Sequence, residues 1–311
     1  MPLPPSDAPA TVATESLREP APNRVGQGIV LMILAIFFFS IMDVLAKALS
    51  EENDSIMVVW ARYAGQTFWT ILFILPSLKT VLRTSVTRLH VLRSVLLFGA
   101  TASFYVALAG LPIAEATAIF EIAPLVITGL AVVFLGEKVG PRRWAAVAAG
   151  LLGALIIIRP GSDVFTPFAL LPLLAATCYA AYAIVTRLMP RTESAWTSLF
   201  YGGVFGTIIS SIIVMPIFAM PESANDLWLF LLIGPVGAAG QYLLILSLQR
   251  APASLLAPFG YVGLGFSALW GVFIFAEIPD GATILGAGII VNAGLFVWYR
   301  ERKEERGDGQ S

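Results

Sequence analysis

The sequence predicts an all-α integral membrane protein with ten transmembrane helices, arranged as two inverted repeats of five helices. Three observations lead to this expectation: the composition, the spacing of the apolar segments and the distribution of basic residues. The chain of 311 residues is 58% hydrophobic and only 13% charged, and its mean hydropathy is +0.83. Soluble domains carry about 25% charged residues, and a soluble chain of this length could not bury so many uncharged segments.

Ten apolar segments approach the length of about 20 residues that a helix needs to cross roughly 30 Å of hydrocarbon. The predicted spans are Gly28–Leu49, Ile56–Leu75, Leu92–Ala109, Ile113–Leu135, Trp144–Ile158, Phe168–Leu188, Trp196–Phe218, Leu227–Leu248, Leu255–Phe275 and Ala282–Tyr299. Turn-forming residues such as Pro112 and Pro279 separate them. The segments do not alternate polar with apolar residues, so the strands of a membrane β-barrel are excluded.

Basic residues collect on one side of the membrane when ten spans are assumed. That side holds 16 of the 19 basic residues: Arg18, Arg24, Lys79, Arg83, Arg88, Arg93, Lys138, Arg142, Arg143, Arg187, Arg191, Arg250, Arg300, Arg302, Lys303 and Arg306. The loops of the opposite side hold Arg159 and a group of acids: Glu51, Glu52, Asp54, Glu222, Asp226, Glu277 and Asp280. Because cytoplasmic loops are enriched in Lys and Arg, both chain ends are expected in the cytoplasm.

The two halves of the chain show a faint internal repeat. An offset of 137 residues places Tyr105 on Tyr242, and an offset of 140 places Lys47 on Arg187. Two tandem units of five spans must insert with opposite orientations, which gives the inverted repeat of secondary transporters. Chance similarity between segments rich in Ala, Leu and Gly is the alternative.

This division predicts four parts. Residues 1–24 are rich in proline and are expected to form a disordered cytoplasmic tail. Residues 25–160 form the first repeat, with helices 1–5, and residues 161–300 form the second, with helices 6–10. Residues 301–311 form a polar cytoplasmic tail.

Charged residues inside apolar spans are costly and usually face a cavity or a partner. Asp43, Arg62 and Glu121 lie on three different predicted helices, on the order of 9–12 Å below the outer surface. They could neutralise one another as a structural lock of three helices, or they could bind a ligand. Desolvation favours the neutral form of Glu121 unless Arg62 is close, so Glu121 is a candidate proton carrier. Lys47, near a helix end, is expected to extend to the interface.

Neutral polar residues complete the predicted binding site. They are Tyr105 in the third predicted span, Gln241 and Tyr242 in the eighth, Tyr261 in the ninth and Asn292 in the tenth. Tyrosines in membrane proteins are commonly interfacial anchors, but these three lie deeper and could instead supply the flat walls of a cavity.

The stretch Ala114–Gly161 closely resembles the end of an EamA repeat of the drug/metabolite transporter superfamily. The matching features are Pro124, Gly136-Glu137, the pair Arg142-Arg143, Gly150 with Gly153, and Arg159-Pro160-Gly161. A second copy, SLLAPFGYVGLGFSALWGVFIFAE, contains Pro258 and Glu277 but has Ala276 where the family usually has Gly.

The resemblance covers roughly Gly28–Tyr299 and implies ten helices in two inverted repeats. It implies that helices 3, 4, 8 and 9 lie near a central cavity, that helices 1 and 6 gate it, and that helices 5 and 10 are peripheral. Members that are similar at this level move amino acids, purines, riboflavin, S-adenosylmethionine or cations.

The expected function is therefore secondary transport of a small polar metabolite by alternating access. An amino acid or similar zwitterion is preferred, because the trio supplies both signs of charge; heterocycles of the riboflavin, purine or S-adenosylmethionine type are the alternative substrates. An enzyme or lipid-handling protein is the rival class, but no HExxH or GxSxG motif is present. The expected partners are the lipid bilayer and protons as a coupling ion, in a monomer or homodimer.

Several other functions are excluded or not expected. A net charge of −1 gives no electrostatic reason to bind nucleic acid. The single Cys178 and the single His90 cannot form a disulfide framework, a zinc site or a catalytic triad. No cofactor and no metal are expected.

Overall fold

The computed structural model describes residues 22–135, 140–162, 165–189, 193–219, 221, 223–251 and 256–308. The predicted N-terminal tail up to residue 21 and the Gly136-Glu137 motif lie outside these residues. The described chain is helical and contains no strand. Its α-helices are α1 (Pro22–Glu52), α2 (Ser55–Ile74), α3 (Leu78–Val81), α4 (Thr87–Leu108), α5 (Ile113–Phe120), α6 (Ala123–Leu135), α7 (Pro141–Ile158), α8 (Leu171–Arg187), α9 (Ala195–Val214), α10 (Ala224–Arg250), α12 (Val262–Ile274) and α13 (Gly281–Asp308). Short 3-10 turns are η2 (Leu75–Ser77), η3 (Pro167–Leu170) and η4 (Ala257–Tyr261).

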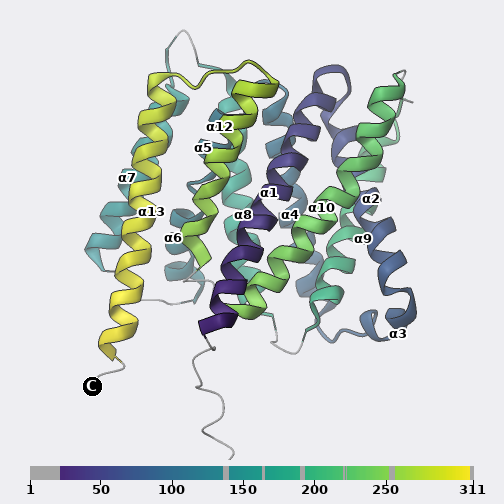
Figure 1. Ribbon diagram of the computed structural model, residues 1–311, viewed down its shortest axis with the longest axis horizontal. Coiled ribbons are helices and arrows are strands. Elements are labelled where there is room, and N and C mark those ends of the chain that lie inside the picture. Colours follow the sequence, from purple (N-terminus) through teal and green to yellow (C-terminus); the bar gives the residue numbers. More distant parts are fainter. Residues whose placement is uncertain are drawn as a thin grey trace, which may run out of the picture.

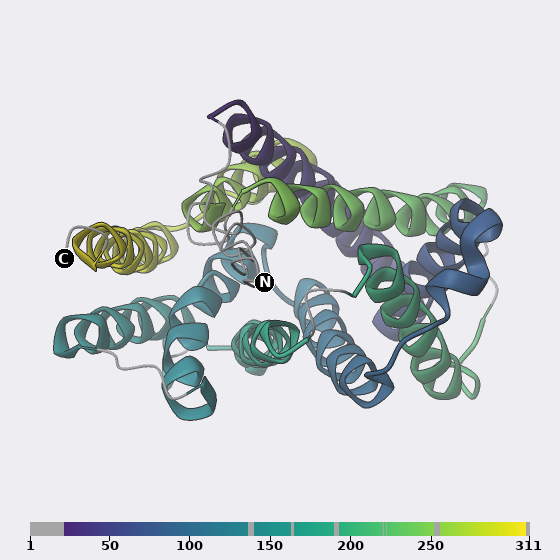
Figure 2. The same cartoon turned by 90° about the horizontal axis from the view of Figure 1, so that it is seen from below.

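The long helices run side by side in a bundle, and α1 begins at the end of the bundle where α13 ends (Figure 1). The pair α7 and α13 lies on one side, and the pair α2 and α9 lies on the other (Figure 2). Between them α1 packs on α10, and α4 packs on α8. Each of these four pairs joins one helix from before residue 161 to one from after it. The two halves of the chain are therefore interleaved rather than stacked as separate domains.

Among the residues that the structure describes, seven helical segments are long and apolar enough to cross a membrane. They are Val25–Glu52, Thr87–Leu108, Ile113–Phe134, Pro167–Thr186, Ala195–Val214, Ala224–Ser247 and Gly281–Tyr299. Trp144–Ile158 and Phe259–Ile274 are apolar but shorter, and α2 has 20 residues but carries Arg62, Gln66 and Thr70. The chain is thus a multi-pass membrane protein, and the number of ten crossings stays a prediction.

The surface and the core are those of a protein in lipid. Large apolar side chains such as Phe73, Val133, Ile212 and Phe273 are 68%, 72%, 70% and 78% exposed in the isolated chain. Inside, small residues let helices approach closely. A Cβ atom on Gly65 of α2 would lie 2.8 Å from the Cα atom of Gly234 of α10, so a side chain at this crossing would separate the two helices.

Two of the predicted spans are interrupted inside the bundle. The span Ile113–Leu135 was expected to be continuous, but α5 ends at Phe120 and α6 begins at Ala123. Proline at position 124 has no N–H to continue the helical hydrogen bonds. In the described part of the ninth span, the 3-10 turn η4, which contains Pro258, precedes α12, which begins at Val262. Among the described residues, each half of the chain therefore has one predicted span that is not a continuous α-helix, and we call these two spans the broken helices.

The last helix extends further than predicted. The tail was expected to start at residue 301, but α13 continues to Asp308. Its polar final turns follow directly from the apolar segment that ends at Tyr299.

Candidate functional site

Arg62 of α2 is the centre of a buried polar cluster. It is 4% exposed, its guanidinium carbon lies 4.5 Å from the centre of the Tyr63 ring, and its Nε donates to the sulfur of Met42 at 3.4 Å. Asp43 of α1 and Tyr105 of α4 both interact electrostatically with Arg62. Its Nη1 and the hydroxyl of Tyr105 are buried without a hydrogen-bond partner among the described residues. Three of the predicted site residues are therefore brought together here, with unused hydrogen-bonding capacity.

Glu121 lies in a different cluster, although the sequence places it at the same depth. It stands at the break between α5 and α6, where its backbone N–H donates to the carbonyl of Thr117 at 3.0 Å. Its electrostatic neighbours are Tyr179 of α8 and Tyr261 of η4, and a Cβ atom on Gly263 would lie 3.7 Å from its Oε1. Neither Asp43 nor Arg62 is among the groups that interact with it. The acid is therefore not neutralised by the arginine.

The two broken helices meet at Glu121. Tyr261 closes η4, and α12, which begins at the next residue, packs on α5. Backbone groups freed inside a membrane protein are tolerated where they are buried in protein or line a cavity. Discontinuous helices of this kind form the substrate and ion sites of many secondary transporters.

Gln241 and Tyr242, neighbours on α10, have different surroundings. Gln241 lines a tight cavity with Gln66 of α2 and Arg93 of α4, whereas the ring of Tyr242 stacks on Trp196 of α9 with centroids 4.8 Å apart. Of the two neighbours, Gln241 therefore faces the interior of the bundle.

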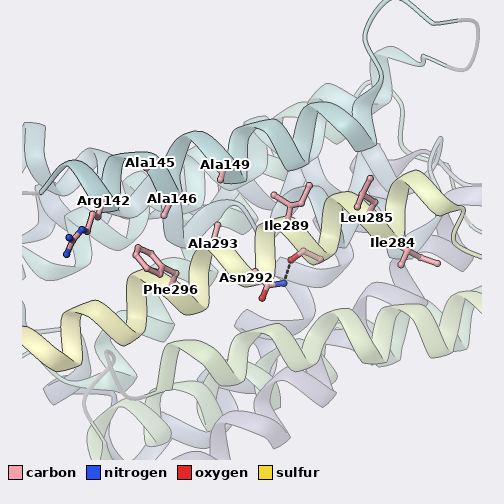
Figure 3. A pocket seen from close by; sticks show the side chains of 11 residues that line it. Arg142, Ala145, Ala146, Ala149, Ile284, Leu285, Ile289, Asn292, Ala293 and Phe296 are labelled. Atoms are coloured by element: carbon pink, nitrogen blue, oxygen red, sulfur yellow. Dashed lines mark hydrogen bonds between the residues drawn. The ribbon is translucent and has the colours of Figure 1, made fainter.

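Asn292 lies apart from the other predicted site residues. It is exposed on α13, and its side-chain amide donates to the carbonyl of Gly288 at 2.7 Å. It lines an apolar groove between α7 and α13 that has a volume of about 790 Å³, with Arg142 at one end and Ile284 and Leu285 at the other (Figure 3). The hydrogen bond within its own helix uses one of the two N–H groups of the amide.

Arg93 was not predicted as a site residue, because it was counted among the basic residues at the inner ends of the spans. In the structure α4 begins at Thr87, so Arg93 lies within the helix and is 8% exposed. Gln66 lies one turn from Arg62 on α2, and it is 3% exposed. The spacing of four residues between two polar side chains in an apolar helix was the available signal.

A polar cluster at the predicted inner end of the bundle joins α4 to the segment before α9. His90 Nε2 lies 3.3 Å from Glu193 Oε2, and the hydroxyl of Thr84 donates to the other oxygen of Glu193 at 2.9 Å. The His90 ring also stacks on Tyr201, with centroids 4.8 Å apart. Its partners make it part of a contact between helices, and no metal-binding group of His, Cys, Asp and Glu occurs among the residues that the structure describes.

Two ion pairs join the halves of the chain at the predicted outer end. Lys47 Nζ lies 2.9 Å from Glu277 Oε1 and donates to the carbonyls of Leu108 and Leu111, while Glu277 Oε2 accepts from the N–H of Ile113 at 3.0 Å. The expectation that Lys47 extends to the interface is wrong, because it is 5% exposed and fully hydrogen-bonded inside.

The second outer ion pair joins Arg159, after α7, to Asp280, before α13. The N–H of Thr283 and the Arg159 guanidinium hold the pKa of Asp280 at about 2, below its ordinary value of 3.8. The Asp280 carboxylate is therefore ionised at any physiological pH. This pair is more exposed than the pair of Lys47 with Glu277.

Apolar helices packed around buried polar side chains, with a broken helix in each half, are typical of a membrane transporter. The comparison with known families agrees. The model of the EamA-like transporter family matches the chain twice, over residues 26–159 and 166–299. The chain belongs to this family.

Several characterised relatives match almost the whole chain. The riboflavin transporter of Rhizobium johnstonii is 35% identical over 92% of this chain and 95% of its own length. The S-adenosylmethionine uptake transporter of Rickettsia prowazekii is 32% identical over 89% and 94%, and the pseudopaline exporter of Pseudomonas aeruginosa is 28% identical over 86% and 94%. A crystal structure with 21% sequence identity covers 90% of this chain and 99% of its own with a TM-score of 0.64, which supports the fold.

Proposed function

We propose that this protein is a secondary transporter that moves a small polar metabolite across the bacterial inner membrane by alternating access. The observation that carries the proposal is the meeting of two broken helices, one from each half, at the partly buried acid Glu121. Alternating access around a fixed site between two repeats is the mechanism that such an arrangement supports.

The proposed topology is ten crossings in two inverted repeats, with both chain ends in the cytoplasm. The double family match supports two repeats, and the start of α1 and the end of α13 at one end of the bundle support an even number of crossings (Figure 1). In this topology three further parts of the chain are complete crossings: α2, the pair α5 and α6, and the pair η4 and α12. The proposed division into 25–160 and 161–300 agrees with the gap between the two family matches.

The proposed substrate combines a zwitterionic end with a flat or apolar body. Both signs of charge occur in separate buried clusters, around Arg62 and around Glu121. Stacked aromatic pairs, Tyr179 with Tyr182 and Trp196 with Tyr242, lie on α8, α9 and α10. A molecule with amino-acid and heterocyclic parts, like the substrate named for the Rickettsia relative, could use all of these groups.

A neutral flat heterocycle is the second candidate, because the relative with 35% identity is named a riboflavin transporter. The aromatic pairs would then provide most of the binding energy, and Asp43 would serve to neutralise Arg62 rather than to contact the substrate. Protons are the proposed coupling ion in either case, with Glu121 as the carrier.

Uptake into proteoliposomes tests the proposal. Purified protein should accelerate uptake of S-adenosylmethionine, riboflavin or an aromatic amino acid over protein-free vesicles, and an inward proton gradient should drive accumulation. A matched control carries Gly65→Leu, which should force α2 from α10 at their closest approach. Uptake of all three compounds at the rate of empty vesicles, by protein that is folded, would contradict the proposed function.

A further inference from the structure

Arg93, on α4, is a buried cation that has no counter-ion among the described residues. Its Nη2 donates to the hydroxyl of Tyr182 at 2.6 Å, and its guanidinium carbon lies 4.8 Å from the centre of that ring. Its Nε is buried without an acceptor. The carboxylate of Glu193, in the part of the chain that the structure describes, is paired with His90 instead. A buried charge without a counter-ion is costly, and inside a membrane span it indicates a function.

The cavity beside Arg93 contains further unused hydrogen-bonding capacity. Gln66 and Gln241 line it together with Arg93, and the Oε1 atom of Gln66 is buried without a donor among the described residues. The cavity thus presents a charged donor, Arg93 Nε, and a neutral acceptor, Gln66 Oε1. A ligand group that satisfies both has an anionic oxygen and a nearby N–H, as an amino-acid end does.

An aromatic pair extends from this cavity toward Glu121. Tyr182, the partner of Arg93, stacks on Tyr179 with ring centroids 5.7 Å apart. Tyr179 interacts electrostatically with both Arg93 and Glu121. The two tyrosines therefore connect the buried cation Arg93 with the partly buried acid Glu121 through a flat apolar surface.

We propose that Arg93 binds the carboxylate of the transported metabolite, with Gln66 accepting a hydrogen bond from an N–H of the same molecule. The flat part of the metabolite then lies along Tyr182 and Tyr179. The cavity has room for about one water molecule in this conformation, so the carboxylate enters when the helices around it move apart during alternating access. This inference rests on the proposed transport function and assigns its substrate a carboxylate.

The test compares ligands that differ in the carboxylate. The thermal stability of the purified protein is measured with S-adenosylmethionine, with its decarboxylated analogue and with riboflavin. S-adenosylmethionine should stabilise the wild type, and the decarboxylated analogue should bind at least tenfold more weakly. Arg93→Gln should weaken the binding of S-adenosylmethionine at least tenfold, Arg93→Lys should weaken it less, and the control Arg142→Gln on the exposed surface of α7 should leave it unchanged.

Thermal stability without ligand separates binding from folding. Because Arg93 is an uncompensated buried charge, Arg93→Gln should melt at the same temperature as the wild type or higher. A large loss of stability in both Arg93→Gln and Arg93→Met would show a structural arginine and overturn the proposal. Equal binding of the decarboxylated analogue, or stabilisation of the wild type by riboflavin and not by S-adenosylmethionine, would overturn the carboxylate site while the transport function stands. Stabilisation of the wild type by none of the three ligands, with no uptake of any, would contradict both.

Discussion

Breaking the ion pair between Lys47 and Glu277 should destabilise the protein more than breaking any exposed pair. Lys47 and Glu277 side chains are 6% and 24% exposed, and they join α1 to the segment between α12 and α13. Removing one partner of a fully buried pair costs about 3–5 kcal/mol. Because Glu277 retains some contact with water and Lys47 keeps two carbonyl acceptors, we expect a smaller coupling energy between the two side chains, about 1–3 kcal/mol.

A double-mutant cycle measures this coupling energy directly. The free energy of unfolding is determined in detergent micelles by titration with a denaturing detergent for the wild type, Lys47→Met, Glu277→Gln and the double variant. Glutamine at position 277 retains the acceptor for the N–H of Ile113, so the cycle isolates the charge interaction. Each single variant should lose stability, and the double variant should lose less than the sum of the two.

The pair of Arg159 with Asp280 is the matched control. Its side chains are 29% and 50% exposed, and exposed pairs contribute about 0.2–1 kcal/mol. The cycle uses Arg159→Gln and Asp280→Asn, and the asparagine can still accept from the N–H of Thr283. A coupling energy for Lys47 and Glu277 that is no larger than that of the control would refute the argument from burial.

Further variants test the topology, the proton carrier and the aromatic pair. Single cysteines are introduced at Ser77 and at Ser162 in a Cys178→Ser background. An impermeant reagent should label the cysteine at position 77 from the cytoplasm and the cysteine at position 162 from the periplasm. Labelling of both from one side would exclude ten crossings. Glu121→Gln should abolish accumulation driven by a proton gradient while substrate exchange continues, and accumulation at the wild-type level would exclude Glu121 as the carrier. Tyr179→Leu should weaken binding of a flat substrate about two- to tenfold, since an aromatic pair contributes about 0.5–1.5 kcal/mol. The control Tyr179→Phe keeps the ring and should bind the substrate almost as well as the wild type. Equal affinities of the two variants would place the ring outside the site.

The helices could be predicted from the sequence because apolar runs of membrane length are a strong local signal. The predicted spans coincide with the helices or with pairs of adjoining helical segments, and the breaks in two of them were not predicted. Pro124 and Pro258 indicated bends at these places, but a proline alone does not distinguish a kink from an interruption. Neighbouring helices decide between the two, because they must satisfy the freed backbone groups.

The partners of the charged residues could not be predicted, because depth in the membrane does not determine position around the bundle. Asp43, Arg62 and Glu121 share a depth, yet Arg62 lies near α1 and α4 whereas Glu121 lies near α8, η4 and α12. Lys47 was assigned to the interface because it is near a helix end. Glu277 lies 230 positions later in the sequence, and only the packing of the helices brings it next to Lys47.

The separation of the charges changes the argument about the substrate. If Asp43, Arg62 and Glu121 formed one cluster, they could neutralise one another and leave little charge for a ligand. Instead Asp43 is near Arg62, while Glu121 and Arg93 have no oppositely charged partner among the described residues and are linked by Tyr179. A buried arginine without a counter-ion is costly in an apolar medium, and the carboxylate of a substrate with a zwitterionic end would offset this cost during transport. A neutral heterocycle would leave Arg93 uncompensated, and this difference is the physical reason for preferring a substrate with a zwitterionic end.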